Sequence, residues 1–336
     1  MLTPDLEHKN SPPRIIPSLV EGFNAVAGRI YLIIFPVVID IFLWFGPLVR
    51  VKNLILPALL RTTELSAGAY GDGASAMIEN SKQLWTLLLE GFNLLFAIRT
   101  YPIGIPSLMI SQGSNINPIG QPLIFEIGSV NTAGLALLIL VLLGVFLGSF
   151  YYALIARSTD KRISDLDISM LFGLVGQSTL LSIFLILLLV ILGLPAMCFI
   201  SSILLFLPSL GTLPFLIFGF FIVWVMLPLA FSPHGIFLSE MKAVRSIVTS
   251  VKLVRTLMAG TGIFFILVIF LSYGLDILWA TPGTNSWLMV IGIIGHGFIS
   301  SGLLAASFVF YRDGVEWLSE FIRSKETNPQ HAGFLD

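Results

Sequence analysis

The sequence is poor in charged residues and contains a single cysteine. Asp, Glu, Lys and Arg make up only 11% of the 336 residues, whereas a soluble domain carries about 25%. The formal net charge of −1 supplies no broad positive field, so we expect no nucleic-acid partner. Cys198 by itself can form neither an intramolecular disulfide nor a cysteine metal site.

The motifs of common enzyme classes are also missing. The sequence has no phosphate-binding P-loop motif, no HExxH zinc motif and no GxSxG nucleophile motif. Its histidines are too scattered to predict a metal site, since they are His8, His234, His296 and His331. We therefore expect no catalytic residue, no cofactor and no metal, and we predict a non-enzymatic protein.

Long apolar runs are what the sequence has instead. Hydrophobic residues make up 56% of the chain, and the mean hydropathy is +0.95. A helix needs about 20 mainly apolar residues to cross the hydrocarbon core of a bilayer. The pattern predicts an all-α integral membrane protein with six transmembrane helices, at 30–49, 133–156, 180–200, 213–231, 262–280 and 287–311.

Two segments outside these spans have their own character. Residues 1–29 are a polar, proline-rich lead with no apolar core, so we expect no cleaved signal peptide. Residues 50–129 are predicted to form a helical and irregular cap. Its apolar stretch 84–98 is short for a span, which favours an interfacial or re-entrant helix. Prolines and glycines in 101–128 predict an apolar loop, without helix or central strand, that lies on the bundle, the membrane or another subunit.

The basic residues predict the orientation. With six spans and the N-terminus inside, 13 of the 18 Lys and Arg residues fall on the inner side, and the two short outer turns have none. Short loops that face the cytoplasm carry an excess of Lys and Arg. We therefore expect cytoplasmic termini, including a tail at 312–336, and a cap on the extracytoplasmic side.

Residues 237–258 predict an amphipathic helix on the inner face. The polar side carries Lys242, Arg245, Ser246 and Lys252, and the apolar side carries Phe237, Val244, Val248 and Val251. Such a helix packs beneath the bundle or lies in the headgroup layer with its cations on anionic lipid. Docking of a partner is the alternative. Phe92 and Tyr101 of the cap are further candidates for contact with lipid or a partner.

A pattern near the C-terminus resembles a known group of proteins. The run from Ala243 to Arg255, a hydrophobic hairpin and the run from Phe308 to Asp313 are similar to the C-terminal half of certain bacterial six-span proteins. Those proteins resemble the membrane domain attached to some glycerophosphodiester phosphodiesterases. The resemblance implies a six-span protein of the bacterial cytoplasmic membrane and identifies no active site. The cap at 50–129 is longer than this resemblance leads us to expect.

Three ionisable residues lie inside the predicted spans, namely Asp40, Asp276 and His296. A charged residue costs about 2.5–3.5 kcal/mol at the centre of a membrane helix, so these are candidates for a polar site in the bundle. We expect both carboxylates to lie near the outer interface, because Trp44 and Trp279 follow them closely. His296 lies among glycines that permit close helix contact. It could bond Asp276 or Asp40, either as a structural link or in a proton or cation relay.

Together these features favour a non-enzymatic membrane protein. It would be an accessory or structural subunit of a membrane complex or a lipid-handling component, with membrane lipid and other membrane subunits as partners. The alternative is a secondary transporter or channel, for which the supporting features are the polar candidates and the spans interrupted by proline. Those prolines are Pro36, Pro195, Pro214 and Pro228. An enzyme acting on lipids ranks third.

Overall fold

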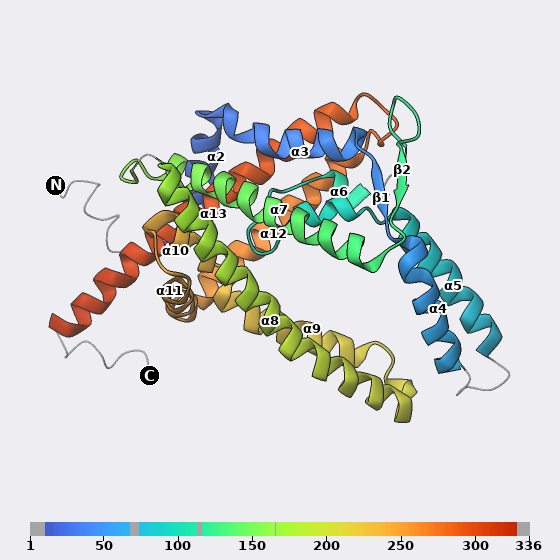
Figure 1. The fold of residues 1–336 in the computed structure, drawn as a ribbon. Helices are drawn as coiled ribbons and strands as arrows, with labels where there is room; N and C mark the ends of the chain where they lie inside the picture. The colour runs from blue at the N-terminus through green and yellow to red at the C-terminus, as the bar shows by residue number, and fades with distance from the viewer. Residues whose placement is uncertain (1–10, 68–73, 113–115, 165, 328–336) are drawn as a thin grey trace.

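The computed structural model describes residues 11–67, 74–112, 116–164 and 166–327. The described chain is built almost entirely of helices (Figure 1). The α-helices are α2 (Ile15–Ala27), α3 (Ile34–Phe45), α4 (Lys52–Ala67), α5 (Ala74–Gly91), α6 (Met109–Gln112), α7 (Val130–Thr159), α8 (Ile168–Phe206), α9 (Leu213–Met226), α10 (Ser232–Ser239), α11 (Ala243–Thr256), α12 (Met258–Ala280) and α13 (Met289–Thr327). Short 3₁₀ turns are η1 (Ile30–Ile33), η3 (Leu94–Ile98), η4 (Pro208–Leu210) and η5 (Leu227–Leu229).

Helix α13 forms the centre of the molecule. Every residue from Ala305 to Tyr311 is buried, so this part of the helix is enclosed on all sides. Helices α2, α3, α7, α10, α11 and α12 all contact it. The contact with α2 is especially close, because a Cβ added at Gly22 would lie 2.3 Å from the backbone nitrogen of Ala306.

Within the part of the chain that the structure describes, five helical segments are long and apolar enough to cross a membrane. They are α7, α8, the α9 to α10 segment, α12 and α13. A sixth is reached only if α2 and the η1 to α3 segment count as one span, and these two are bent by 92°. Each of the last five predicted spans overlaps one of these helical segments. The predicted ranges are 133–156, 180–200, 213–231, 262–280 and 287–311.

The first predicted span, 30–49, was wrong in its extent. The helix ends at Phe45, and the chain is extended from Leu48, because Gly46 and Pro47 interrupt the helical run. The predicted polar lead at 1–29 contains a regular helix. Helix α2 occupies Ile15–Ala27 and packs against α13.

Several other predicted bounds need correction. Pro195 lies inside α8 without ending it. Helix α9 ends before Pro228, which has no N–H to continue the ladder, and the chain restarts as α10 after η5. Phe237 therefore belongs to α10, and the helix predicted at 237–258 begins at Ala243. The tail predicted at 312–336 is helical as far as Thr327, the last described residue.

The cap also departs from an all-α prediction. Strands β1 (Leu48–Arg50) and β2 (Ile124–Glu126) pair in parallel, with Leu48 opposite Ile124. We predicted no central strand in 101–128, and β2 is consistent with this because a strand in a two-stranded sheet is always an edge strand. The prediction of no helix there was wrong for the single turn of α6.

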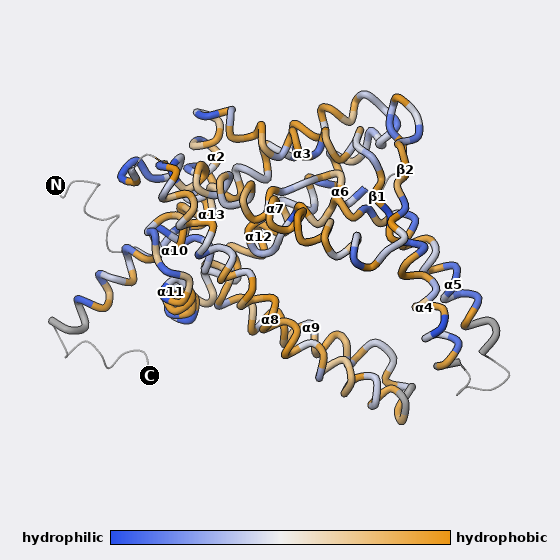
Figure 2. Tube along the Cα trace, viewed as in Figure 1, coloured by the Kyte–Doolittle hydropathy of each residue, from blue (hydrophilic) through white to orange (hydrophobic). Residues whose placement is uncertain are grey.

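Two helical hairpins project from the bundle. Helices α4 and α5 lie side by side, as do α8 and the shorter α9, and both pairs extend away from α3 and α13 (Figure 1). Figure 2 shows hydrophobic residues along most of α8 and α9. Large apolar side chains there are exposed, for example Phe199 and Phe220. An apolar surface of this extent requires lipid or protein around it.

Candidate functional site: a cavity beneath an irregular loop

Residues 93–109 form an irregular loop that enters the helical bundle instead of lying on its outer face. Helix α6 begins at the last residue of this loop and contacts α3. Ile103 and Leu108 of this loop are fully buried. We expected the apolar residues of the cap, including Leu84, Leu88 and the Tyr101 to Pro106 turn, to lie on the bundle, the membrane or another subunit. Ile103 and Ile105 of the turn lie in the bundle, whereas Tyr101, Leu84 and Leu88 are exposed.

Asn93 anchors the first end of the loop. Its side chain is fully buried at the end of α5. The Oδ1 atom accepts hydrogen bonds from the backbone N–H groups of Val49, at 3.0 Å, and Leu95, at 3.1 Å, and Nδ2 donates to the Pro47 carbonyl at 3.2 Å. Asn93 thus caps the 3₁₀ turn η3 and ties the loop to β1. Because α5 ends at Gly91, the apolar stretch 84–98 is not one continuous helix.

Asp40 anchors the second end. Its carboxylate, fully buried on α3, accepts bonds from the Ser107 hydroxyl at 2.5 Å and from the backbone N–H groups of Leu108 and Met109, each at 3.0 Å. A buried carboxylate is tolerated when its oxygens are fully hydrogen-bonded. Asp40 thus holds the loop in place. It makes no hydrogen bond to His296, so the alternative that paired His296 with Asp40 was wrong.

Two glycines of α7 receive the loop backbone. A Cβ added at Gly144 would lie 2.2 Å from the Ile98 carbonyl oxygen, and one at Gly148 would lie 2.7 Å from the Ile103 carbonyl oxygen. The spacing of these glycines predicts a close helix contact, and the structure places a loop there instead. Gly144 lies halfway along α7. At the depth of a bilayer core, non-helical backbone occurs only where protein buries it or where it lines a cavity.

A cavity of about 410 Å³ lies beneath this loop. Helices α7, α8, α10, α12 and α13 and turn η5 supply its other walls. Apolar side chains dominate those walls, including Leu185, Phe265 and Val268. Arg99 and Tyr101 are exposed and line it from the loop. Its volume falls in the range of about 300–1,000 Å³ that is usual for small-molecule sites.

A buried polar pair forms another part of the cavity wall. His234 Nε2 lies 2.7 Å from the Ser307 hydroxyl, and both side chains are buried. His234 Nδ1 is buried without a hydrogen-bond partner among the described residues. In the sequence, His234 stands isolated from the other histidines and was not a candidate. Its contact with Ser307 could not be predicted, because the two residues are 73 positions apart.

His296 and Asp276 form the second polar pair, as one of the two sequence-based alternatives expected. His296 Nδ1 lies 2.7 Å from Asp276 Oδ1 and links α13 to α12. Nε2 of the same ring is buried without a partner among the described residues. The Ser300 hydroxyl, which lines the cavity, donates to the His296 carbonyl at 2.7 Å. The pair is therefore one helical turn from the cavity.

Glycines around His296 permit the expected close approach. A Cβ at Gly292 would lie 2.2 Å from the Trp279 carbonyl oxygen, and one at Gly295 would lie 2.7 Å from the Trp279 ring. Helix α12 therefore packs directly on the backbone of α13 at this level. This contact holds Asp276 against His296.

The surface candidates lie where solvent or lipid can reach them. Lys242, Arg245 and Lys252 are exposed on or beside α11, and Phe92 and Tyr101 are exposed on the cap. The face that α11 turns to the protein differs from the predicted one: Ser246 and Ser250 are buried, whereas Val244 and Val248 are exposed.

The serines of α11 face inward because carbonyl groups near the break at η5 need donors. The Ser246 hydroxyl donates to the Ser232 carbonyl at 2.5 Å, and the Ser250 hydroxyl donates to the Pro228 carbonyl at 2.7 Å. Buried backbone carbonyls are almost always paired. The helix break at Pro228 thus leaves carbonyl groups that the serines of α11 bind, and these bonds place the serine face of α11 against the protein.

No protein-family model, curated protein or solved structure matches this chain. Among the described residues, no group of three or more His, Cys, Asp or Glu side chains could hold a metal ion.

Proposed function

We propose that this chain is a non-enzymatic, multi-pass membrane protein that binds a membrane lipid in the cavity beneath the 93–109 loop. One observation carries the proposal. The 93–109 loop packs against the middle of α7, a helix long enough to span a membrane, and it forms one wall of a cavity. That cavity is mainly apolar and has polar groups at a few positions. Non-helical backbone of this kind in membrane proteins commonly lines a binding site.

The lining residues suggest how such a lipid would lie. An acyl chain suits the apolar walls formed by Leu185, Phe265 and Val268. The guanidinium of Arg99 and the phenol of Tyr101 supply donors for a polar or anionic headgroup. The cavity thus offers an amphipathic ligand both of the environments that it needs.

The proposal includes six spans with both termini on the cytoplasmic side of a bacterial inner membrane. Basic residues of the α2, α7 to α8 and α13 segments gather around one cavity, lined by Arg29, Lys161, Arg162 and Arg312. Elsewhere, the Trp44 indole donates to the Thr284 carbonyl at 2.8 Å and lies 6.2 Å from the Trp287 ring. Positive charge at the inner face and tryptophan at an interface are both typical of membrane proteins.

Filling the cavity should release the lipid. We expect Ser272→Trp, which places an indole in the cavity wall on α12, to reduce the lipid that co-purifies in mild detergent by about ten-fold, a loss of ~1.4 kcal/mol in binding. Mass spectrometry of the purified protein measures the bound lipid. Tyr273→Trp is the matched control, because its side chain is exposed on the same helix and does not line the cavity.

Two results would contradict lipid binding in this cavity: absence of lipid from the wild-type protein, or equal amounts of lipid in the two variants. The thermal transition of Ser272→Trp is measured in parallel to show that this variant is folded. Partner proteins that co-purify in fixed ratio, with no lipid bound, would favour the accessory-subunit function.

The second candidate function is a secondary transporter, which the His296 to Asp276 pair favours. Ionisable pairs within membrane helices often belong to proton or ion pathways. For a lipid-binding protein, we expect His296→Leu to lower the free energy of unfolding by about 1–3 kcal/mol, because Asp276 loses its hydrogen-bond partner. Lipid binding should persist.

A flux assay separates the two functions. Protein in liposomes is given a pH gradient, and proton entry is followed with an internal dye. Flux in the wild-type protein that disappears in a stably folded His296→Leu variant would establish the transporter instead. Ser202→Leu, exposed on α8, serves as the control for an added apolar side chain.

A further inference from the structure

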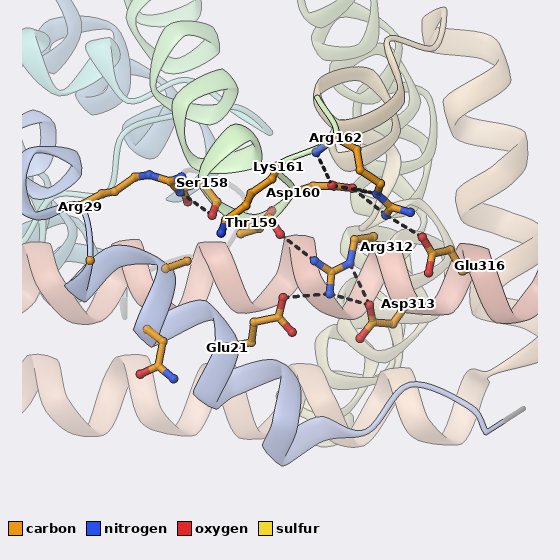
Figure 3. A pocket seen from close by; sticks show the side chains of 13 residues that line it. Glu21, Arg29, Ser158, Thr159, Asp160, Lys161, Arg162, Arg312, Asp313 and Glu316 are labelled. Atoms are coloured by element: carbon orange, nitrogen blue, oxygen red, sulfur yellow. Dashed lines mark hydrogen bonds and ion pairs between the residues drawn. The ribbon is translucent and has the colours of Figure 1, made fainter. Parts of the chain in front are cut away.

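A second cavity, of about 730 Å³, lies between α2, the turn that joins α7 to α8, and α13 (Figure 3). It shares no lining residue with the cavity under the loop. Charged side chains line it from all three segments. The cations are Arg29, Lys161, Arg162 and Arg312, and the carboxylates are Glu21, Asp160, Asp313 and Glu316.

Carboxylates neutralise two of these cations. Arg312 lies 2.9 Å from Glu21 and 2.8 Å from Asp313, and it also donates to the Thr159 carbonyl at 2.6 Å. The second cation, Arg162, lies 2.8 Å from Asp160 and 2.6 Å from Glu316. Hydrogen bonds from Arg162 lower the pKa of the Asp160 carboxyl, so that group is charged at neutral pH.

The other two cations have no carboxylate partner among the described residues. Arg29 Nη1 donates to the Ser158 carbonyl at 2.6 Å and makes no ion pair. Lys161 makes neither a hydrogen bond nor an ion pair in the described structure. Figure 3 shows the side chains of Arg29 and Lys161 both directed toward Ser158, at the end of α7.

The charge in this cavity is therefore unevenly distributed. Around Arg162 and Arg312, four carboxylates face two cations, so this half carries a formal excess of negative charge. The half around Ser158 carries two positive charges beside the C-terminus of α7. The partial negative charge of that terminus amounts to roughly half an elementary charge, so a local positive excess remains around Ser158. A guanidinium beside an ammonium is a suitable donor set for phosphate oxygens.

We propose that Arg29 and Lys161 bind a phosphate group in this cavity. The group belongs either to the headgroup of an anionic phospholipid or to a free phosphate ion. Arg29 is held in place by its bond to Ser158, which leaves its other N–H groups for the ligand. Lys161 is exposed and can close over the bound group.

Native mass spectrometry of the full chain, titrated in detergent, tests this site. The probes are short-chain phosphatidylglycerol, short-chain phosphatidylcholine and sodium phosphate. We expect the wild-type protein to bind phosphatidylglycerol more tightly than phosphatidylcholine, and Lys161→Gln to weaken that binding by about five-fold or more. Competition by sodium phosphate would show that phosphate alone suffices, and its absence would identify the lipid as the source.

Two variants complete the test. Lys82→Gln removes the same charge from an exposed position on α5, outside the cavity, and should change binding by less than about two-fold. Arg29→Gln should weaken binding further, and its thermal transition is measured in parallel because it also loses the bond to Ser158. Equal losses in Lys161→Gln and Lys82→Gln, or none in Lys161→Gln, would overturn the proposal. Ser272→Trp should leave this binding unchanged whether or not lipid occupies the other cavity.

Discussion

Replacing Asp40 with alanine should lower the free energy of unfolding by about 3 kcal/mol or more and release the loop from the bundle. The reason is that the Ser107 hydroxyl and the N–H groups of Leu108 and Met109 would lose their common acceptor. Each buried donor left unpaired costs about 1–3 kcal/mol. Thermal or denaturant unfolding in detergent measures the change in stability.

Cysteine labelling then tests whether the loop has moved. In a Cys198→Ser background, a cysteine introduced at Ile105, which is 4% exposed, should react with a water-soluble maleimide only in the Asp40→Ala protein. Asp167→Ala is the matched control: this exposed carboxylate caps α8, so its loss should cost about 1 kcal/mol and leave residue 105 protected. Equal stabilities of the two variants would show that Asp40 is not an anchor.

Replacing Gly144 with valine should have a comparable effect from the opposite wall. The new Cβ would meet the Ile98 carbonyl oxygen at 2.2 Å, which is closer than any atomic contact allows. Either the loop or α7 must shift, and overpacking of this kind costs about 1–3 kcal/mol or more. We expect the loop to leave α7, co-purified lipid to fall with it, and the cysteine at position 105 to become reactive.

Gly134→Val provides the control on the same helix. A Cβ added at Gly134 meets nothing within 4 Å, so the change in helix propensity is matched and the clash is absent. Stability, lipid content and labelling should all resemble the wild-type protein. If Gly144→Val also behaves like the wild type, the position of the loop does not depend on its contact with α7. That contact would then no longer support the cavity as a binding site.

The candidate site was only partly predictable. Asp276 and His296 could be identified because ionisable groups are rare in apolar runs, and their pairing was one of two alternatives considered. Asp40 was identified for the same reason, yet its partners lie 67 to 69 residues away in the cap. His234 and Asn93 carried no such signal, since one polar residue near a helix end is common in any sequence.

The sequence by itself determined that the chain is mainly helical and where its long apolar helices lie. Apolar composition and helical periodicity act over neighbouring residues, so α7 and α12 could be located to within about one turn at each end. The spans predicted at 180–200 and 287–311 were too short, because α8 begins at Ile168 and α13 continues to Thr327. Proline chemistry is equally local, but its effect on a helix depends on position: α9 ends before Pro228, whereas Pro195 and Pro36 lie inside α8 and α3. Errors concentrated at helix ends, where flanking contacts compete with propensity.

Only the tertiary structure decided what lies beside these helices. The loop could have rested on the membrane, on a partner or in the bundle, and its apolar composition suits all three. The loop lies in the bundle for two reasons. The buried side chains of Asp40 and Asn93 accept hydrogen bonds from backbone N–H groups, which lipid tails could not do. Gly144 has no side chain, so the loop backbone can approach α7 closely. The unequal pairing of Arg29, Lys161 and Arg312 likewise depends on three segments far apart in the chain.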